Sequence, residues 1–150
     1  MLFSIIQFLN DFVIIPTFLD NYGIIAIISD LTALVVFLSF FCASCKDPGH
    51  LKPLEDTTFL DIMDNISHID LCSDCKVIRT ARSRHCAICN HCVERFDHHC
   101  PWINNCVGIK NHNMFFTFLL SIWVKILFHI VLVIYSMNEM FSNPTSDGSP

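Results

Sequence analysis

Residues 71–108 read LCSDCKVIRTARSRHCAICNHCVERFDHHCPWINNCVG, and this stretch decides how the chain folds. Seven of the nine cysteines and five of the eight histidines lie between positions 72 and 112. Cys72 and Cys75 form one C-x2-C pair, which lets two thiolates from one tight turn bind the same tetrahedral ion. An overlapping pair of the same motif follows at Cys86, Cys89 and Cys92. An odd number of cysteines mixed with histidines favours metal over disulfides, and it indicates a reducing compartment.

The same stretch has few residues with which to build a hydrophobic core. About 35 residues with so few bulky apolar side chains cannot fold on burial alone, so bound metal must replace the missing core. Two structural zinc ions would take eight ligands. The candidates are the seven cysteines of the stretch and several of its histidines, so at least one cysteine can be left over.

Cys100 is the best candidate for the spare cysteine on chemical grounds. It follows Asp97, His98 and His99 directly, which puts imidazole and carboxylate groups beside the thiol. A thiolate is a strong nucleophile, and a neighbouring histidine can take the proton from the thiol. Asp97 can then fix the tautomer of His98 and stabilise its cation. The alternative is that Cys100 is one more zinc ligand.

The rest of the chain is strongly apolar. Hydrophobic residues make up 53% of the chain and charged residues 15%, whereas about a quarter of an average soluble protein is charged. Three apolar stretches, at 2–19, about 22–45 and 114–137, each approach the roughly 20 residues that a membrane-spanning helix needs. The first is the weakest, and a buried or interfacial helix is its alternative. We expect two transmembrane helices in 1–45, a zinc domain at 46–113, a third transmembrane helix at 114–137 and a disordered tail at 138–150.

Charge indicates the orientation of these segments. Eight of the nine lysines and arginines fall between positions 46 and 110, which places the zinc domain in the cytosol by the positive-inside rule. A nucleic-acid partner would require more basic residues on a soluble face, so we expect none. The ninth, Lys125, lies inside the third apolar stretch, where we expect it to pair with Asp30 or Asp11. No repeat of domain size is visible.

The string Asp97-His98-His99-Cys100-Pro101-Trp102, in its cysteine-rich frame, resembles the DHHC protein S-acyltransferases, or palmitoyltransferases. The resemblance extends to Asn105-Cys106-Val107-Gly108, to Asn111-x3-Phe115 and to Asp47-Pro48-Gly49, and covers about residues 22–137. It implies an all-α membrane protein with a cytosolic, zinc-stabilised domain of short hairpins between the second and third helices.

The resemblance also implies roles for individual residues. Two interleaved structural zinc sites would be formed by Cys72, Cys75, His85 and Cys92, and by Cys86, Cys89, His99 and Cys106. Cys100 would carry the acyl group, with His98 as general base and Asp97 orienting it. Palmitoyl-CoA would be the co-substrate, and we expect Trp102, Arg84 and Arg95 to bind it. The acyl group would pass to cysteines of cytosolic or juxtamembrane proteins at the lipid bilayer.

The family pattern continues with a fourth helix and a Thr-Thr-x-Glu motif, which we expect this chain to lack. A non-catalytic zinc-stabilised membrane adaptor, or an inactive fragment of such an enzyme, is therefore the alternative. Membranes of the Golgi, the endoplasmic reticulum and the cell surface are equally compatible with the sequence.

Overall fold

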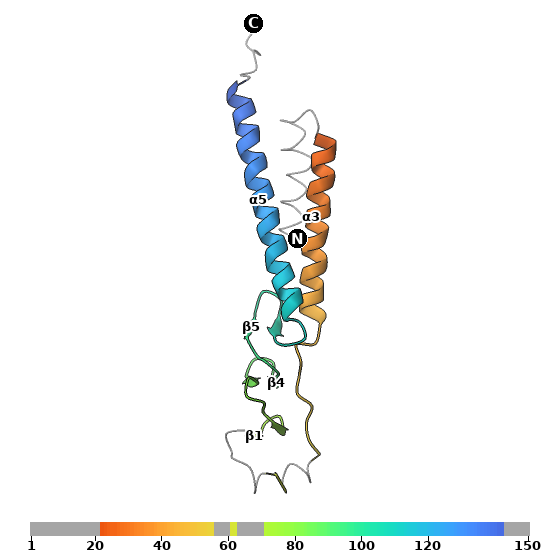
Figure 1. Cartoon of the computed structure of the whole chain (residues 1–150), viewed down its shortest axis with the longest axis vertical. Helices are drawn as coiled ribbons and strands as arrows, with labels where there is room; N and C mark the ends of the chain where they lie inside the picture. The colour runs from red at the N-terminus through yellow and green to blue at the C-terminus, as the bar shows by residue number, and fades with distance from the viewer. Residues whose placement is uncertain (1–21, 56–60, 63–70, 143–150) are drawn as a thin grey trace. The chain divides into compact units, whose positions relative to one another are not determined.

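The computed structural model describes residues 22–55, 61–62 and 71–142. Among these residues, helix α3 (Tyr22–Cys45) is followed by six short strands and then by helix α5 (His112–Ser142). Figure 1 shows both helices and labels several of the strands. The chain divides into two units, one made of Leu38–Phe118 and the other of Met1–Phe37 with Leu119–Pro150. We expected three membrane helices. The described residues contain two long apolar helices with a cysteine-rich hairpin domain between them, and the stretch 2–19 lies outside these residues.

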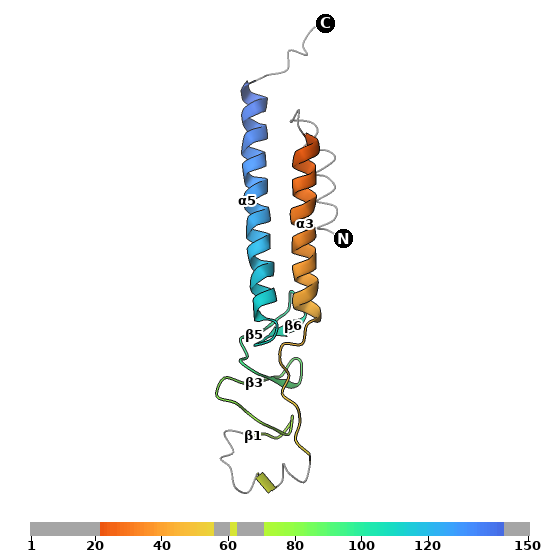
Figure 2. The same ribbon diagram turned by 45° about the vertical axis from the view of Figure 1, so that its right-hand side comes forward.

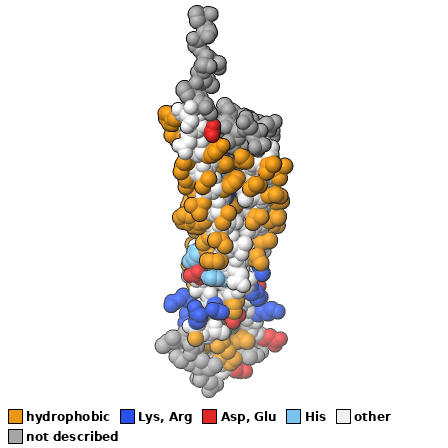
Figure 3. All heavy atoms as spheres, turned by 45° about the horizontal axis from the view of Figure 1, so that its top comes forward, with side chains coloured by type: hydrophobic (Ala, Val, Ile, Leu, Met, Phe, Trp, Pro, Cys, Tyr) orange, Lys and Arg blue, Asp and Glu red, His pale blue; other side chains and the backbone are white. Residues whose placement is uncertain are grey.

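Both helices are long and apolar enough to cross a membrane. The candidate spans are Gly23–Cys45, with a mean hydropathy of 2.4, and His112–Glu139, with 2.3. Their exposed side chains are hydrophobic over most of their length, as the orange surface in Figure 3 shows. Helix α5 runs to Ser142, so residues 138–142, where we expected the disordered tail to begin, are helical. No proline or glycine interrupts the helix before Pro144.

One charged side chain is buried within the apolar helices. Lys125, only 6% exposed, donates hydrogen bonds to the backbone oxygen of Ser29 at 2.7 Å and to its hydroxyl oxygen at 3.0 Å. The expected pairing with a carboxylate, Asp30 or Asp11, stays a prediction. The two Ser29 oxygens are the partners described for this ammonium group. They supply acceptors for an ammonium group that would otherwise be costly to bury. Asp11, the other carboxylate considered, lies outside the described residues.

Three antiparallel hairpins follow one another at intervals of 14 residues. They pair β1 (Leu71–Cys72) with β2 (Val77–Ile78), β3 (Arg84–Cys86) with β4 (His91–Val93), and β5 (His98–Cys100) with β6 (Asn105–Val107). Each turn contains one residue in the left-handed region, namely Lys76, Asn90 and Asn104, with φ between 49° and 55°. The described residues 71–107 are therefore one hairpin unit repeated three times, a period that we did not detect in the sequence.

The core of the hairpin domain is divided into small clusters, each centred on cysteines. Cys72, Val77 and Cys92 form one, and Cys86, Val93 and Cys106 form the second. The third contains Cys100 together with Ala43, Ile103 and Val107. None of these clusters is large enough to hold a domain together by apolar burial alone, as the sparse core in the sequence predicted.

The residues around Asp47 connect the end of α3 to the hairpins and to the segment that precedes α5. The Asp47 carboxylate accepts hydrogen bonds from the backbone N–H groups of Gly49 and His50, and it forms an ion pair with Lys110 at 2.8 Å. The Lys110 ammonium, followed by the backbone N–H of His50, lowers the pKa of Asp47 despite some opposing burial. Backbone hydrogen bonds from Glu94 to Gly49 and from Lys110 to Pro48 extend the same connection.

Candidate functional site

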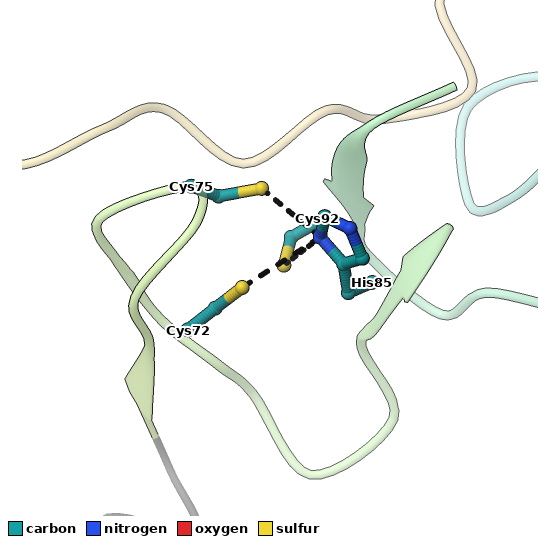
Figure 4. Close-up of side chains that lie close together, drawn as sticks. All are labelled: Cys72, Cys75, His85 and Cys92. Atoms are coloured by element: carbon teal, nitrogen blue, oxygen red, sulfur yellow. Dashed lines mark hydrogen bonds between the residues drawn. The ribbon is translucent and has the colours of Figure 1, made fainter. Parts of the chain in front are cut away.

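The first metal-ligating cluster combines a turn with a hairpin. Cys72 and Cys75 come from the β1–β2 turn, whereas His85 and Cys92 face each other across the β3–β4 ladder. Figure 4 shows the four side chains converging on one point. The Nδ1 atom of His85 lies 3.6, 3.2 and 3.9 Å from the sulfurs of Cys72, Cys75 and Cys92.

The second cluster repeats this arrangement one hairpin further along the chain. Cys86 and Cys89 come from the β3–β4 hairpin, and His99 faces Cys106 across the β5–β6 ladder. The Nδ1 atom of His99 lies 3.8, 3.3 and 3.6 Å from the sulfurs of Cys86, Cys89 and Cys106. Because His85 and Cys86 are adjacent in β3, they point to opposite faces and serve different clusters. This alternation is what interleaves the two sites.

Both clusters fit a zinc ion. The four ligand atoms of each lie within 4.8 Å of one another. A tetrahedral zinc with ordinary bond lengths separates sulfur from nitrogen by about 3.6 Å, close to the distances above. Burial, with neighbouring thiols adding to it, raises the pKa of Cys92 and of Cys106. Three thiols so close together do not ionise together readily unless a cation compensates their charge. The eight residues that we expected as ligands are the eight that the structure brings together.

The hairpin repeat gives a structural reason why Cys100 belongs to neither cluster. Cys72 and Cys86 begin the first two C-x2-C turns, and Cys100 holds the equivalent position in the third hairpin. The position of the second cysteine is taken there by Ile103, which is 2% exposed and packs in the same small core as Cys100. The third turn thus keeps the first thiol of a metal-binding turn but replaces its partner with a buried hydrocarbon side chain.

Two acid–base side chains lie beside Cys100 in the chain. His98 and Cys100 are two residues apart in β5, so they point to the same face, while His99 between them points to the second cluster. The Oδ2 atom of Asp97 lies 3.6 Å from Nδ1 of His98. The His98 ring also packs edge-on against Phe115, with 5.4 Å between centroids. These contacts direct Nδ1 of His98 toward a carboxylate.

A pocket of about 400 Å³ opens next to these residues. Its lining consists of Arg82, Arg95, Phe96, Asp97, Gly108, Ile109, His112 and Asn113. Two guanidinium groups and an imidazole in one pocket suit a phosphate-bearing ligand. Of the three residues expected to bind acyl-CoA, Arg95 lines this pocket. Arg84 is exposed on β3, and Trp102 is 85% exposed; neither is among the lining residues.

Sequence reasoning considered Arg82 for the CoA phosphates but did not select His112 as a site residue. Nε2 of His112 lies 3.8 Å from the same Asp97 oxygen that His98 approaches. The sequence carries no motif that would reveal this contact. The 14-residue period, in contrast, was present as Cys-x2-Cys-x9-His-x6-Cys, which occurs at positions 72–92 and again at 86–106. This repeated spacing alone indicates both Cys3His clusters.

Comparisons with known proteins agree with this geometry. The sequence model of the family described as DHHC palmitoyltransferase matches residues 65–149. Palmitoyltransferase swf1 of Schizosaccharomyces pombe is 43% identical over 117 residues, covering 75% of this chain and 33% of that protein. Palmitoyltransferase ZDHHC5 of Homo sapiens is 34% identical over 123 residues, covering 71% of this chain and 17% of that protein. This chain therefore spans a third or less of these relatives. With its two Cys3His clusters and the intact Asp97–Cys100 string, the chain belongs to the DHHC palmitoyltransferase family.

Proposed function

We propose that the chain is a protein S-acyltransferase that carries a long-chain acyl group on Cys100. The observation that carries this proposal is that eight metal-ligating side chains are gathered into two clusters, while Cys100 stands apart from both. In this proposal the Cys100 thiol is not a metal ligand, so it is available for covalent chemistry. Asp97 and His98 supply the base that such a nucleophile requires.

The reaction has two thioester exchanges. His98 takes the proton of the Cys100 thiol, and the thiolate attacks the carbonyl carbon of palmitoyl-CoA. A new carbon–sulfur bond forms at Cys100, the bond to the CoA sulfur breaks, and the CoA thiolate leaves with a proton. A cysteine thiolate of the protein substrate then attacks the acyl-enzyme, and Cys100 is released. Because one thioester replaces another, the protein mainly has to position and activate the reactants.

The surroundings of Cys100 suit an acyl chain on one side and CoA on the other. Cys100 is 4% exposed and lies in an apolar cluster that also contacts Phe40 of α3 and Phe115 and Phe118 of α5. Burial of a C16 chain contributes about 0.8 kcal/mol per CH2 group. Arg82 and Arg95 in the neighbouring pocket would face the CoA phosphates, with Arg84 and the exposed Trp102 at the surface near the thioester.

Zinc in this scheme is structural. Four protein ligands close each site, so neither offers a position to substrate. The bound ions would hold the three hairpins in register, and every chemical step belongs to Cys100, His98 and Asp97. The basic hairpin domain would face the cytosol, where thiols stay reduced and acyl-CoA is present.

The test is labelling of the purified, zinc-loaded chain with a clickable palmitoyl-CoA analogue. We expect a label that hydroxylamine removes and that is absent from Cys100→Ser. Cys42→Ser is the matched control, because Cys42 is an exposed cysteine outside both clusters, and it should be labelled like the wild type. An unlabelled wild-type chain with two bound zinc ions would favour the adaptor instead.

A further inference from the structure

Asn105 joins the hairpin that carries Cys100 to the last turn of α3. Its side-chain nitrogen lies 3.3, 3.0 and 2.9 Å from the backbone oxygens of Ala43, Ser44 and Lys46. A carboxamide has two N–H protons, so the three carbonyl groups share two donors. The last carbonyls of a helix have no partner within it, and Asn105 supplies donors from outside the helix. Its own Oδ1 atom accepts the backbone N–H of Cys106 at 2.8 Å.

The position of Asn105 connects this cap to the nucleophile. Asn105 is the cross-strand partner of Cys100 in the β5–β6 ladder. Ala43, one of the residues whose carbonyl oxygen Asn105 binds, packs in the same small core as Cys100. Figure 2 shows β5 and β6 beside the C-terminal end of α3 and the start of α5. One side chain therefore fixes Cys100 against the end of a candidate membrane span.

The backbone oxygen of Ala43 also accepts a hydrogen bond from a second asparagine, Asn111. Asn111, which is fully buried, donates to the backbone oxygen of Ala43 at 3.3 Å and to that of Cys106 at 2.8 Å. Its Oδ1 atom accepts the backbone N–H of Gly108. Asn111 thus supports the loop between β6 and α5, while Asn105 is opposite Cys100 itself. This difference makes Asn105 the residue whose loss acts most directly on the nucleophile.

We propose that Asn105 is a positioning residue that sets Cys100 in register with the apolar seam between Phe40 and Ala43 of α3 and Phe115 and Phe118 of α5. In this proposal a long acyl chain attached at Cys100 lies along this seam, whereas a short one ends near the thiol. Displacement of Cys100 should therefore impair reaction with long acyl chains more than reaction with short ones. A residue that only stabilises the domain would affect both chain lengths equally. The inference rests on the proposed acyl transfer at Cys100.

The experiment compares acyl-enzyme formation from palmitoyl-CoA and butyryl-CoA in the full zinc-loaded chain. Asn105→Ala removes both donors and the acceptor. Asn105→Asp has the same shape and keeps an acceptor for Cys106, but it places a negative charge against the helix carbonyls. The matched control is Asn104→Gly, because Asn104 is an exposed neighbour with φ 49°, a conformation that glycine adopts freely.

With both Asn105 variants, we expect the rate with palmitoyl-CoA to fall roughly tenfold or more, as loss of positioning hydrogen bonds implies. We expect the rate with butyryl-CoA to change less than about threefold by the same reasoning. Zinc content should remain at two ions per chain, and Asn104→Gly should match the wild type. An equal loss of rate with palmitoyl-CoA and butyryl-CoA, or no loss with either of them, would overturn the proposal.

A second readout separates this inference from the proposed activity. Iodoacetamide reacts with an accessible thiol whether or not the chain transfers acyl groups. Cys100 is 4% exposed, so releasing the hairpin from α3 should speed its alkylation in both Asn105 variants. If wild type forms no acyl-enzyme but the variants alkylate faster, the positioning role holds and the proposed function fails. If alkylation of Cys100 is unchanged in the variants, the positioning role is wrong.

Discussion

His99 faces Cys106 across the β5–β6 ladder, with 3.6 Å between Nδ1 and the sulfur. The next residue along the strand, Cys100, points to the other face and is opposite Asn105. A change of one position in an extended strand thus separates a member of a Cys3His cluster from a thiol that belongs to neither cluster. Because successive side chains of a strand point to opposite faces, adjacent residues of one motif can have unrelated roles.

Ile103 occupies the position that holds the second cysteine of the C-x2-C pair in the first two turns. Ile103→Cys restores the C-x2-C spacing of the first two turns and offers Cys100 a partner. We expect this variant to sequester Cys100 in a disulfide or in metal coordination, and acyl-enzyme formation should fall at least roughly tenfold because the thiolate is the reacting form. Ile103→Val is the control that keeps an apolar side chain at this position. Undiminished labelling of Ile103→Cys would show that its new thiol does not reach Cys100.

Loss of one ligand should cost one metal ion. Cys92→Ser removes a ligand of the first cluster only, and Cys106→Ser a ligand of the second. Each should lower zinc from two ions per chain to about one, because a structural site needs all four protein ligands. Zinc binding contributes on the order of 10 kcal/mol to small domains of this kind, so the affected hairpins should unfold and become protease-sensitive. Zinc content is measured by mass spectrometry of the metal, with Cys45→Ser, a cysteine outside both clusters, as the control.

The Asp47–Lys110 ion pair makes a contribution to the free energy of unfolding that decreases at low pH. Lys110 lowers the pKa of Asp47 in the folded protein below its usual value of 3.8. Stabilisation by the carboxylate is therefore complete above about pH 4 and is lost as the pH falls toward the lower folded value. Asp47→Asn keeps the acceptor for Gly49 and His50 but removes the charge. The Tm difference between wild type and Asp47→Asn should be fully present at pH 5 and should shrink as the pH falls below about 4. A difference that shrinks between pH 7 and pH 5 would contradict this assignment.

Gly108 is a position where even a methyl group does not fit. A Cβ atom there would overlap the backbone oxygen of Pro48 and lie 2.5 Å from Cγ1 of Val93. We expect Gly108→Ala to destabilise the hairpin domain by about 1–3 kcal/mol, as overpacking commonly does. Gly23→Ala is the matched control, since nothing lies within 4 Å of its added Cβ. The control should be neutral or slightly stabilising in helix α3. Equal stability of the two variants would refute the close approach of Pro48 to Gly108.

Much of the site could be predicted from the sequence because ligand chemistry is local. The spacing of Cys72 and Cys75 fits one tight turn, and the run from Asp97 to Cys100 puts acid, base and thiol in adjacent positions. The distribution of the eight ligands between two clusters came from the family resemblance, since spacing alone allowed Cys100 to be a ligand. The strand alternation and the 14-residue hairpin period now supply its physical reason.

The long-range contacts could not be predicted in the same way. Nothing local indicates that Asn105 caps α3, about 60 residues earlier in the chain, or that Lys125 donates hydrogen bonds to oxygens of Ser29. Such contacts depend on which segments pack together. The two apolar stretches at 22–45 and 114–137 could be recognised from hydropathy, but the end of α5 depended on the first helix-breaking residue after Met137.

The most direct measurement locates the acyl group in the zinc-loaded chain after a single incubation with palmitoyl-CoA. Native mass spectrometry counts the metal ions, and peptide sequencing by tandem mass spectrometry identifies the modified cysteine. We predict one hydroxylamine-sensitive palmitoyl group, on Cys100, in a chain that retains two zinc ions. A palmitoyl group on one of the six cluster cysteines with loss of an ion, or a Cys100 bound to metal, would contradict the account.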